Sequence, residues 1–232
     1  MVGSVAVLAA GDMVQADPSR GPSNESGGGS SSADCPQAEV TLAVIQRRYD
    51  GINDLSANFE QETRSVVLAD TDDRETSRGR VLLAKPGRMR WAYDEPDASF
   101  VISDGKTVWV HDVAASQVTQ MPMGEGYLAG AALDFLFGEG RIEESFRAST
   151  AGCGTRGTRL ELLPREAASF ERLSLTVRPG DGLVTATSIT DLFGNQTAIR
   201  FSDIRLNQSP PAEAFQFEPP EGAEVIDLST SR

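Results

Sequence analysis

The chain has 232 residues, of which 34 are acidic and 21 are basic, so its formal net charge at pH 7 is −13. This charge argues against a nucleic-acid-binding protein, because phosphate binding requires a basic surface. One histidine and two cysteines exclude multi-histidine zinc sites and four-thiolate metal sites, and leave an acidic, largely globular protein.

The amino end predicts processing and linker segments rather than a folded unit. Residues 1–16 contain a short apolar run and end in VQA, which is typical of a small-residue cleavage site. We interpret them as a weak or truncated secretory signal, and the alternative is a disordered tail. Residues 17–34 are rich in Gly, Ser and Pro and predict a flexible linker. The single folded domain is therefore expected over 35–232.

The two cysteines point to an oxidising compartment. Lipid attachment to Cys35 is not expected, because Asp34 occupies the position where a small residue is needed and the preceding linker is polar. We expect Cys35 and Cys153 to form one disulfide. The alternative is a pair of unrelated thiols.

The first elements are a helix and a strand. Apolar residues recur at helical spacing over about 37–52, and Gly51 is placed as a helix stop. From Leu55 to Phe59 the apolar period changes to two, which predicts a half-buried strand. The charged run in 66–77 is interpreted as a solvated hairpin loop, because it lacks the spaced carboxylates and closing glutamate of an EF-hand loop.

The remainder predicts a mainly β protein with a few helices. Alternating segments separated by short Gly, Pro and Asp turns predict an antiparallel meander, which must curl or close because it is so long. The glycine-flanked segment at 152–154 is interpreted as a turn. The predicted strands lie at 80–84, 88–93, 100–103, 107–111, 116–121, 158–163, 171–178, 183–190 and 196–206.

One segment does not follow the apolar–polar alternation of the predicted strands. Residues 127–137, YLAGAALDFLF, predict a short and very apolar helix. It would either pack as ordinary core over one sheet face or form a lid over an apolar cavity.

Catalytic chemistry is disfavoured. A Ser–His–Asp triad could use only His111, which lies on a predicted strand, and the chain has no strained nucleophile elbow. Binding is the stronger hypothesis, because a curled sheet with an apolar helix encloses a hydrophobic pocket.

The motifs then resemble those of the periplasmic outer-membrane lipoprotein carrier family, LolA. Residues 79–120 contain a glycine-led strand, a basic-Pro-Gly turn, an aromatic strand with Trp91, and then Ser-Asp-Gly before another aromatic strand. LSANFEQ at 55–61 resembles the family's first strand, and FEPPEG at 217–222 resembles its closing motif. The resemblance covers about 37–226.

The resemblance implies an incomplete, unclosed antiparallel β-barrel covered by a helical lid. It implies a periplasmic carrier that holds the acyl chains of lipoproteins in a hydrophobic cavity. A monomer would take its cargo from an inner-membrane ABC-type lipoprotein-releasing complex and pass it to an outer-membrane lipoprotein receptor. No reaction and no cofactor are implied.

The resemblance also suggests functional residues. In the family, an arginine before the Pro fastens the lid. Here Lys85 occupies that position, which predicts a looser or differently fastened lid. The alternative is that Lys85 is a solvated lysine in a turn. Arg88 and Arg90 lie in a local basic cluster and are expected to contact partners. The residues expected to line the acyl-chain cavity are Phe59, Leu83, Met89, Trp91, Phe100, Ile102, Trp109, Leu128, Leu133, Phe135 and Leu136.

Two points stay open at this level. The strand register does not settle whether Phe100 or Val101, or Trp109 or its neighbours, faces the cavity, because a one-residue shift exchanges the faces. The main alternative function is a related barrel that carries a lipid or glycolipid, or an envelope sensor that binds a partner protein.

Overall fold

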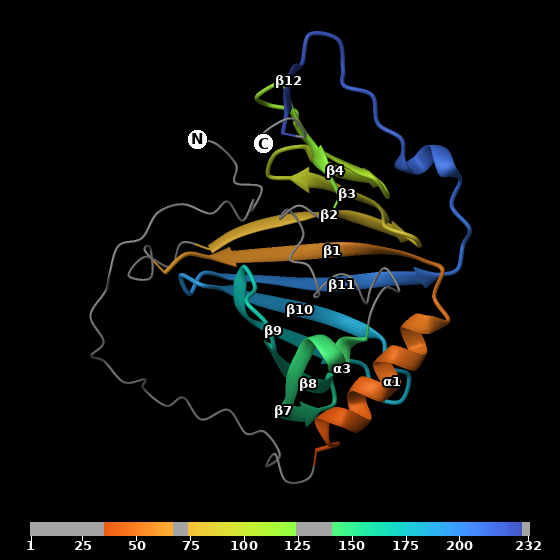
Figure 1. The fold of residues 1–232 in the computed structure, drawn as a ribbon, viewed down its shortest axis with the longest axis vertical. Coiled ribbons are helices and arrows are strands. Elements are labelled where there is room, and N and C mark those ends of the chain that lie inside the picture. The colour runs from red at the N-terminus through yellow and green to blue at the C-terminus, as the bar shows by residue number, and fades with distance from the viewer. Residues whose placement is uncertain (1–34, 67–73, 124–140, 229–232) are drawn as a thin grey trace.

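The computed structural model describes residues 35–66, 74–123 and 141–228. They form a 12-stranded sheet in the order β12-β6-β5-β4-β3-β2-β1-β11-β10-β9-β8-β7. The sheet curls, but in the described residues its edge strands β12 and β7 do not pair with each other, so the barrel is unclosed (Figure 1).

The elements have the following bounds. The helices are α1 (Ala38–Asp50), α3 (Ile142–Ser145) and the 3-10 turn η2 (Ala212–Phe215). The strands are β1 (Asp54–Arg64), β2 (Arg74–Ala84), β3 (Arg88–Glu95), β4 (Ser99–Asp104), β5 (Thr107–Asp112), β6 (Gln117–Pro122), β7 (Phe146–Gly154), β8 (Gly157–Pro164), β9 (Phe170–Val177), β10 (Val184–Asp191), β11 (Gln196–Leu206) and β12 (Glu224–Asp227).

The sheet consists of two antiparallel meanders, joined where β1 pairs with β11. Aspartates at the hairpin turns fix the strand connections: the Asp104 carboxylate accepts hydrogen bonds from the backbone N–H groups of Lys106 and Thr107, both at 2.8 Å. The meander prediction is confirmed for β2 to β6 and for β7 to β11. The exception is β12, which pairs parallel with β6.

The helix α1 lies along β7–β10 (Figure 1) and buries its apolar stripe, including Leu42, Ile45 and Tyr49. These side chains belong to the same core cluster as one face of the sheet, which we call the inner face. The Tyr49 hydroxyl accepts a hydrogen bond from the backbone N–H of Val184 at 3.3 Å, which fixes the helix against β10. Acidic Glu39 and basic Arg47 and Arg48 complement the helix dipole.

The disulfide prediction is confirmed. Cys35 and Cys153 are bonded, with their Cα atoms 5.6 Å apart, and join the segment before α1 to the edge strand β7. Beside the bridge, the Thr150 hydroxyl donates to the Pro36 carbonyl at 2.8 Å. The start of α1 is therefore tied to the edge of the sheet.

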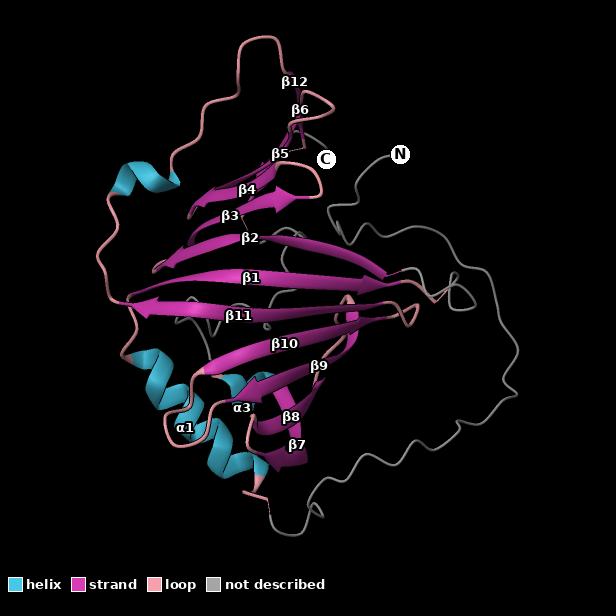
Figure 2. Cartoon of the chain, turned by 180° about the vertical axis from the view of Figure 1, so that it is seen from behind, coloured by secondary structure: helices cyan, strands magenta, loops and turns pink. Residues whose placement is uncertain are grey.

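Part of the chain after β11 packs on the other face of β3 to β5, which we call the outer face. We call residues 207–223 the strap; it runs from the end of β11 to β12 along one side of the sheet (Figure 2). Asp54, which is buried at the start of β1, accepts hydrogen bonds from the backbone N–H groups of Gln208 and Ser209, at 2.7 and 3.0 Å. A buried carboxylate thus fixes where the strap begins.

Some element predictions require correction. Residues 74–77 are not loop but the first part of β2, and 152–154 are not a turn but the end of the edge strand β7. The expected signal segment 1–16, linker 17–34 and apolar helix 127–137 lie outside the described residues.

Candidate functional site

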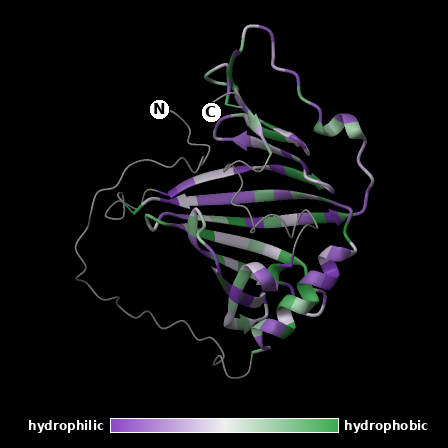
Figure 3. Ribbon diagram, viewed as in Figure 1, coloured by the Kyte–Doolittle hydropathy of each residue, from purple (hydrophilic) through white to green (hydrophobic). Residues whose placement is uncertain are grey.

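An aromatic cluster occupies the middle of the inner face. The Phe59 ring meets Trp91 and Tyr93 edge-on, with centroids 4.9 and 5.0 Å apart, and Trp91 lies 6.3 Å from Phe201. Phe59 is buried, whereas the other three are partly exposed. We call these four residues the inner aromatic patch. Apolar and polar residues alternate along the central strands that carry it (Figure 3).

A glycine allows two of these rings to meet. In the sheet register, Gly79 of β2 lies between Phe59 of β1 and Tyr93 of β3. Because Gly79 has no side chain, the two rings close over it. A Cβ there would lie 1.9 Å from the Ala92 carbonyl oxygen and 3.0 Å from the Phe59 ring, so no larger residue fits.

Polar groups adjoin the patch on the same face. Gln61 lies two residues after Phe59 in β1 and opposite Ser77 in β2. The Tyr93 hydroxyl donates to Oε1 of Gln61 at 3.1 Å. Burial raises the pKa of Tyr93 to about 12, so the phenol stays protonated in any periplasmic or cytoplasmic setting.

Four of the predicted cavity residues share this inner face. Phe59, Leu83, Met89 and Trp91 all belong to or pack against the inner core cluster. Leu83 pairs with Met89, and Val81, two residues earlier in β2, pairs with Trp91. Leu83 and Met89 are buried, so only Trp91 of these four presents a partly exposed side chain to the inner face.

The structure places Phe100, Ile102 and Trp109 on the outer face. Directly paired residues share a face of a sheet, and Ile102 pairs with Arg90 and Trp109, whereas Trp91 pairs with Val101. Val101, Val108 and Val110 occupy the inner positions instead. The sequence left the faces of these strands open, and the register places all three residues on the face opposite Trp91. A contact of any of them with acyl chains stays a prediction.

The strap explains why these residues are apolar although they face outward. Phe217 of the strap lies 6.2 Å from Trp109 and 5.6 Å from His111, which stacks on Phe100. Phe215 is buried beneath Arg88. His111 therefore belongs to a packed aromatic cluster between β5 and the strap.

The basic residues of β3 already have contacts within the chain. The Arg88 guanidinium lies 5.1 Å from the Phe215 ring and donates to the Lys85 carbonyl at 3.0 Å. Arg90 lies 5.4 Å from the Phe100 ring. Both side chains remain half-exposed on the outer face, and their contact with partners stays a prediction.

Lys85 fastens the sheet to α1. Its Nζ donates to the carbonyl of Tyr49, in the last turn of the helix, at 2.6 Å, so it is not simply a solvated turn lysine. Burial lowers the pKa of Lys85, and the charge of Asp50 partly opposes that effect. The adjoining cavity of ≈ 10 Å³ has room for about one water and none for a hydrocarbon chain.

Replacing Lys85 with methionine is expected to lower the free energy of unfolding by about 1–3 kcal/mol, because a charge-assisted hydrogen bond to a helix carbonyl is lost. Urea denaturation of Lys85→Met and Lys85→Arg measures this. The arginine variant keeps the charge and should be the more stable of the two. A methionine variant as stable as the wild type would show that the contact contributes nothing.

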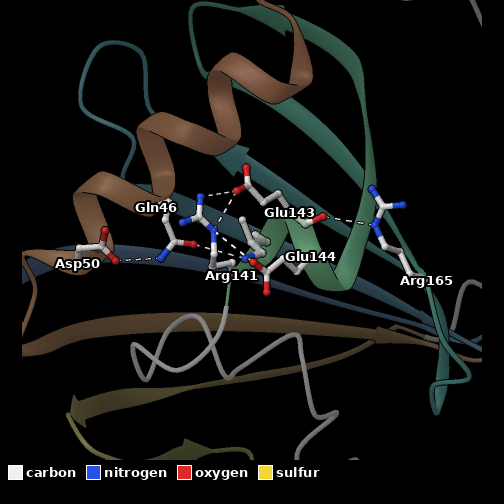
Figure 4. A network of polar contacts seen from close by, with 7 residues as sticks. Gln46, Asp50, Arg141, Glu143, Glu144 and Arg165 are labelled. Atoms are coloured by element: carbon white, nitrogen blue, oxygen red, sulfur yellow. Dashed lines mark hydrogen bonds and ion pairs between the residues drawn. The ribbon is translucent and has the colours of Figure 1, made fainter.

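The predicted lid residues Leu128, Leu133, Phe135 and Leu136 lie outside the described residues. The chain is described again from Arg141, where a polar network fastens α3 to α1 (Figure 4). Gln46 of α1 accepts from the Ile142 backbone N–H at 3.4 Å and donates to Asp50 at 2.9 Å. Arg141 pairs with Glu143 in the same network.

Sequence reasoning missed Tyr93, Ile199 and Phe201 as site residues. Tyr93 continues the alternation of Met89 and Trp91 and could have been included on that signal. Ile199 and Phe201 alternate along β11, but their place beside Gln61 and Phe59 depends on the pairing of β11 with β1. Local pattern does not encode that pairing.

The comparison with known families settles the lineage. The model of the outer membrane lipoprotein carrier protein LolA family matches residues 50–218. The chain belongs to the LolA family. The resemblance inferred from the sequence motifs is therefore confirmed.

Relatives match over most of their length. The outer-membrane lipoprotein carrier protein of Chromobacterium violaceum is 32% identical over 193 residues, which cover 82% of this chain and 89% of that protein. The protein of the same name from Alkalilimnicola ehrlichii is 31% identical over 195 residues, which cover 83% of this chain and 86% of that protein.

A solved structure supports the fold. An uncharacterized conserved protein from Thermus thermophilus superposes with a TM-score of 0.51 at 13% identity, over 82% of this chain and 98% of that one.

LolA-family carriers are periplasmic and are not enzymes. No helix among the described residues has the length and apolar character needed to cross a membrane.

Proposed function

We propose that this protein carries lipoproteins through the periplasm, with their acyl chains held against the inner aromatic patch. The observation that carries the proposal is the set of partly exposed apolar side chains on the inner face of a LolA-family sheet, with Trp91 and Phe201 at its centre. Hydrocarbon binding there is favourable because each buried CH₂ contributes about 0.8 kcal/mol.

The proposal includes the finer features that the family suggests. Residues 127–137 would form the lid over the bound chains. Lys85, in place of the family's arginine latch, would leave that lid looser or fastened differently. Cargo would come from an inner-membrane ABC-type releasing complex and go to an outer-membrane receptor. Arg88 and Arg90 are the basic residues proposed to meet these partners, and no cofactor is needed for any step.

The test is release of an acylated lipoprotein from inner-membrane vesicles that contain the ABC-type complex and ATP. Phe201→Glu is expected to lower the amount released by about tenfold or more, because the binding of acyl chains would bury an unpaired charge. The partly exposed Phe201 should tolerate the carboxylate in the empty protein, so the fold is retained.

The matched control lies on the same hairpin. Phe193, in the turn between β10 and β11, is 66% exposed, and Phe193→Glu makes the same chemical change away from the inner face. Its release activity should equal that of the wild type. Equal activity of Phe201→Glu would remove the inner face as the site, and binding of free lipids without release of lipoprotein would favour the alternative lipid carrier.

A further inference from the structure

A small group of polar side chains interrupts the apolar inner face. Gln61 is 5% exposed and Ser77 is 8% exposed, and the two lie opposite each other in β1 and β2. The Tyr93 hydroxyl reaches the same point from β3 and donates to Gln61. Phe59, on the same face of β1, lies 5.0 Å from Tyr93, so the polar group directly adjoins the aromatic patch.

This polar group has hydrogen-bonding capacity to spare. The Gln61 amide carries two N–H donors, and its oxygen already accepts from Tyr93. Within residues 35–66, 74–123 and 141–228, neither the Gln61 amide nitrogen nor the Ser77 hydroxyl has a hydrogen-bond partner. Among the described residues, the fully buried side-chain atoms without a partner all belong to arginines, so the unused donors of Gln61 and Ser77 are reachable from the inner face. Unused donors that are reachable from a binding face can donate to a ligand acceptor in place of water.

The chemistry of these donors defines the acceptor. Gln61, Ser77 and Tyr93 are all neutral, whereas a phosphate or carboxylate would call for arginine or lysine. In the sheet register, the inner-face position of β11 opposite Gln61 is held by Ile199, which carries no charge. A neutral carbonyl oxygen next to a hydrocarbon chain is the acceptor that fits both halves of the site.

We propose that Gln61, supported by Tyr93 and Ser77, binds the ester or amide carbonyl at the head of an acyl chain whose hydrocarbon lies on the inner aromatic patch. The inference rests on the proposed function and adds to it a recognition of the acyl linkage. The subsite would fix the position of the acyl chain along the inner face, because the carbonyl is hydrogen-bonded only beside these donors.

The experiment compares two lipids that differ only in the carbonyl at the head of each of their two chains. Dimyristoylglycerol and its ether analogue, ditetradecylglycerol, each compete with a hydrophobic fluorescent dye bound to the protein. The wild type is expected to bind the ester about fivefold more tightly than the ether, the effect of one neutral hydrogen bond. Gln61→Leu should bind both lipids equally, because it keeps the side-chain volume and removes the donors.

Two further variants complete the design. Tyr93→Phe removes a single oxygen and should reduce the preference for the ester, which keeps the test valid if Gln61→Leu folds poorly. Gln196→Leu makes the matched change at an exposed site at the start of β11 and should keep the full preference.

The outcomes separate the two proposals. A wild type that binds both lipids equally would overturn the subsite and leave the carrier function intact. The same holds if Gln61→Leu and Tyr93→Phe both keep the full preference for the ester. A wild type that binds neither lipid and releases no lipoprotein would overturn the carrier function and the subsite together.

Discussion

Removal of the Cys35–Cys153 disulfide is expected to lower the free energy of unfolding by about 4–5 kcal/mol. The bridge joins residues 118 positions apart, so it closes a loop that includes α1 and half of the sheet. Without it, the unfolded chain gains the freedom of that whole loop. For a protein of this size the loss corresponds to a fall in Tm of about 8–20 °C.

Urea denaturation of the Cys35→Ser, Cys153→Ser double variant measures the effect, and the wild type in reductant should reproduce it. Reductant should not change the stability of the double variant, which makes that variant its own control. If thiol titration shows full reduction of the wild type while its unfolding midpoint stays unchanged, the loop-closure argument is wrong. The bridge is also consistent with the periplasmic setting of the family, since disulfides persist in oxidising compartments.

Much of the sheet could be predicted from sequence because residues that favour turns, such as Asp and Gly, mark its hairpins. Alternation and the Asp104-Gly105 turn identified β4 and β5, and similar signals identified β8 to β11. The edge strand β7 was not predicted, because FRASTAGCG is rich in small residues and carries no clear alternation. The strand β12 was missed because its four residues are all exposed and pair with a strand about 100 residues away.

Which side chains of β4 and β5 lie on the inner face could not be predicted, for a different reason. These strands carry apolar residues on both faces, because the inner face packs in the core and the strap covers the outer face. Phe100 and Val101 are therefore both apolar, and the period of two that distinguishes faces disappears. Only the return of Phe215 and Phe217 from the far end of the chain shows which face the strap covers.

The candidate site shows the same division between local and long-range information. The alternation of Met89 and Trp91 correctly placed both on one face, and Phe59 joined them through the pairing of neighbouring strands. Phe201 entered the site only through the pairing of β11 with β1. Sequence reasoning therefore found Phe59 and Trp91 within one meander and overlooked Tyr93 beside them, whereas Phe201 comes from the other meander and had no local signal.

Phe59→Ala is expected to lower the free energy of unfolding by about 3–5 kcal/mol, because it leaves a cavity where a buried ring packed. Phe59 is 3% exposed and touches both Trp91 and Tyr93, and its contacts hold β1 to β3 across Gly79. Urea denaturation measures the loss. Phe193→Ala removes the same ring from an exposed turn and should change stability by no more than about 0.5 kcal/mol.

Comparison of Phe59→Ala with Phe201→Ala distinguishes a role in stability from a role in hydrocarbon binding. Because Phe59 is buried and Phe201 is partly exposed, Phe59→Ala should chiefly reduce stability, whereas Phe201→Ala should chiefly weaken dye binding. The stability lost on Phe59→Ala should thus exceed that lost on Phe201→Ala, and the order should reverse for dye affinity. The same order in both measurements would mean that the patch is a single packed core, with no surface reserved for hydrocarbon.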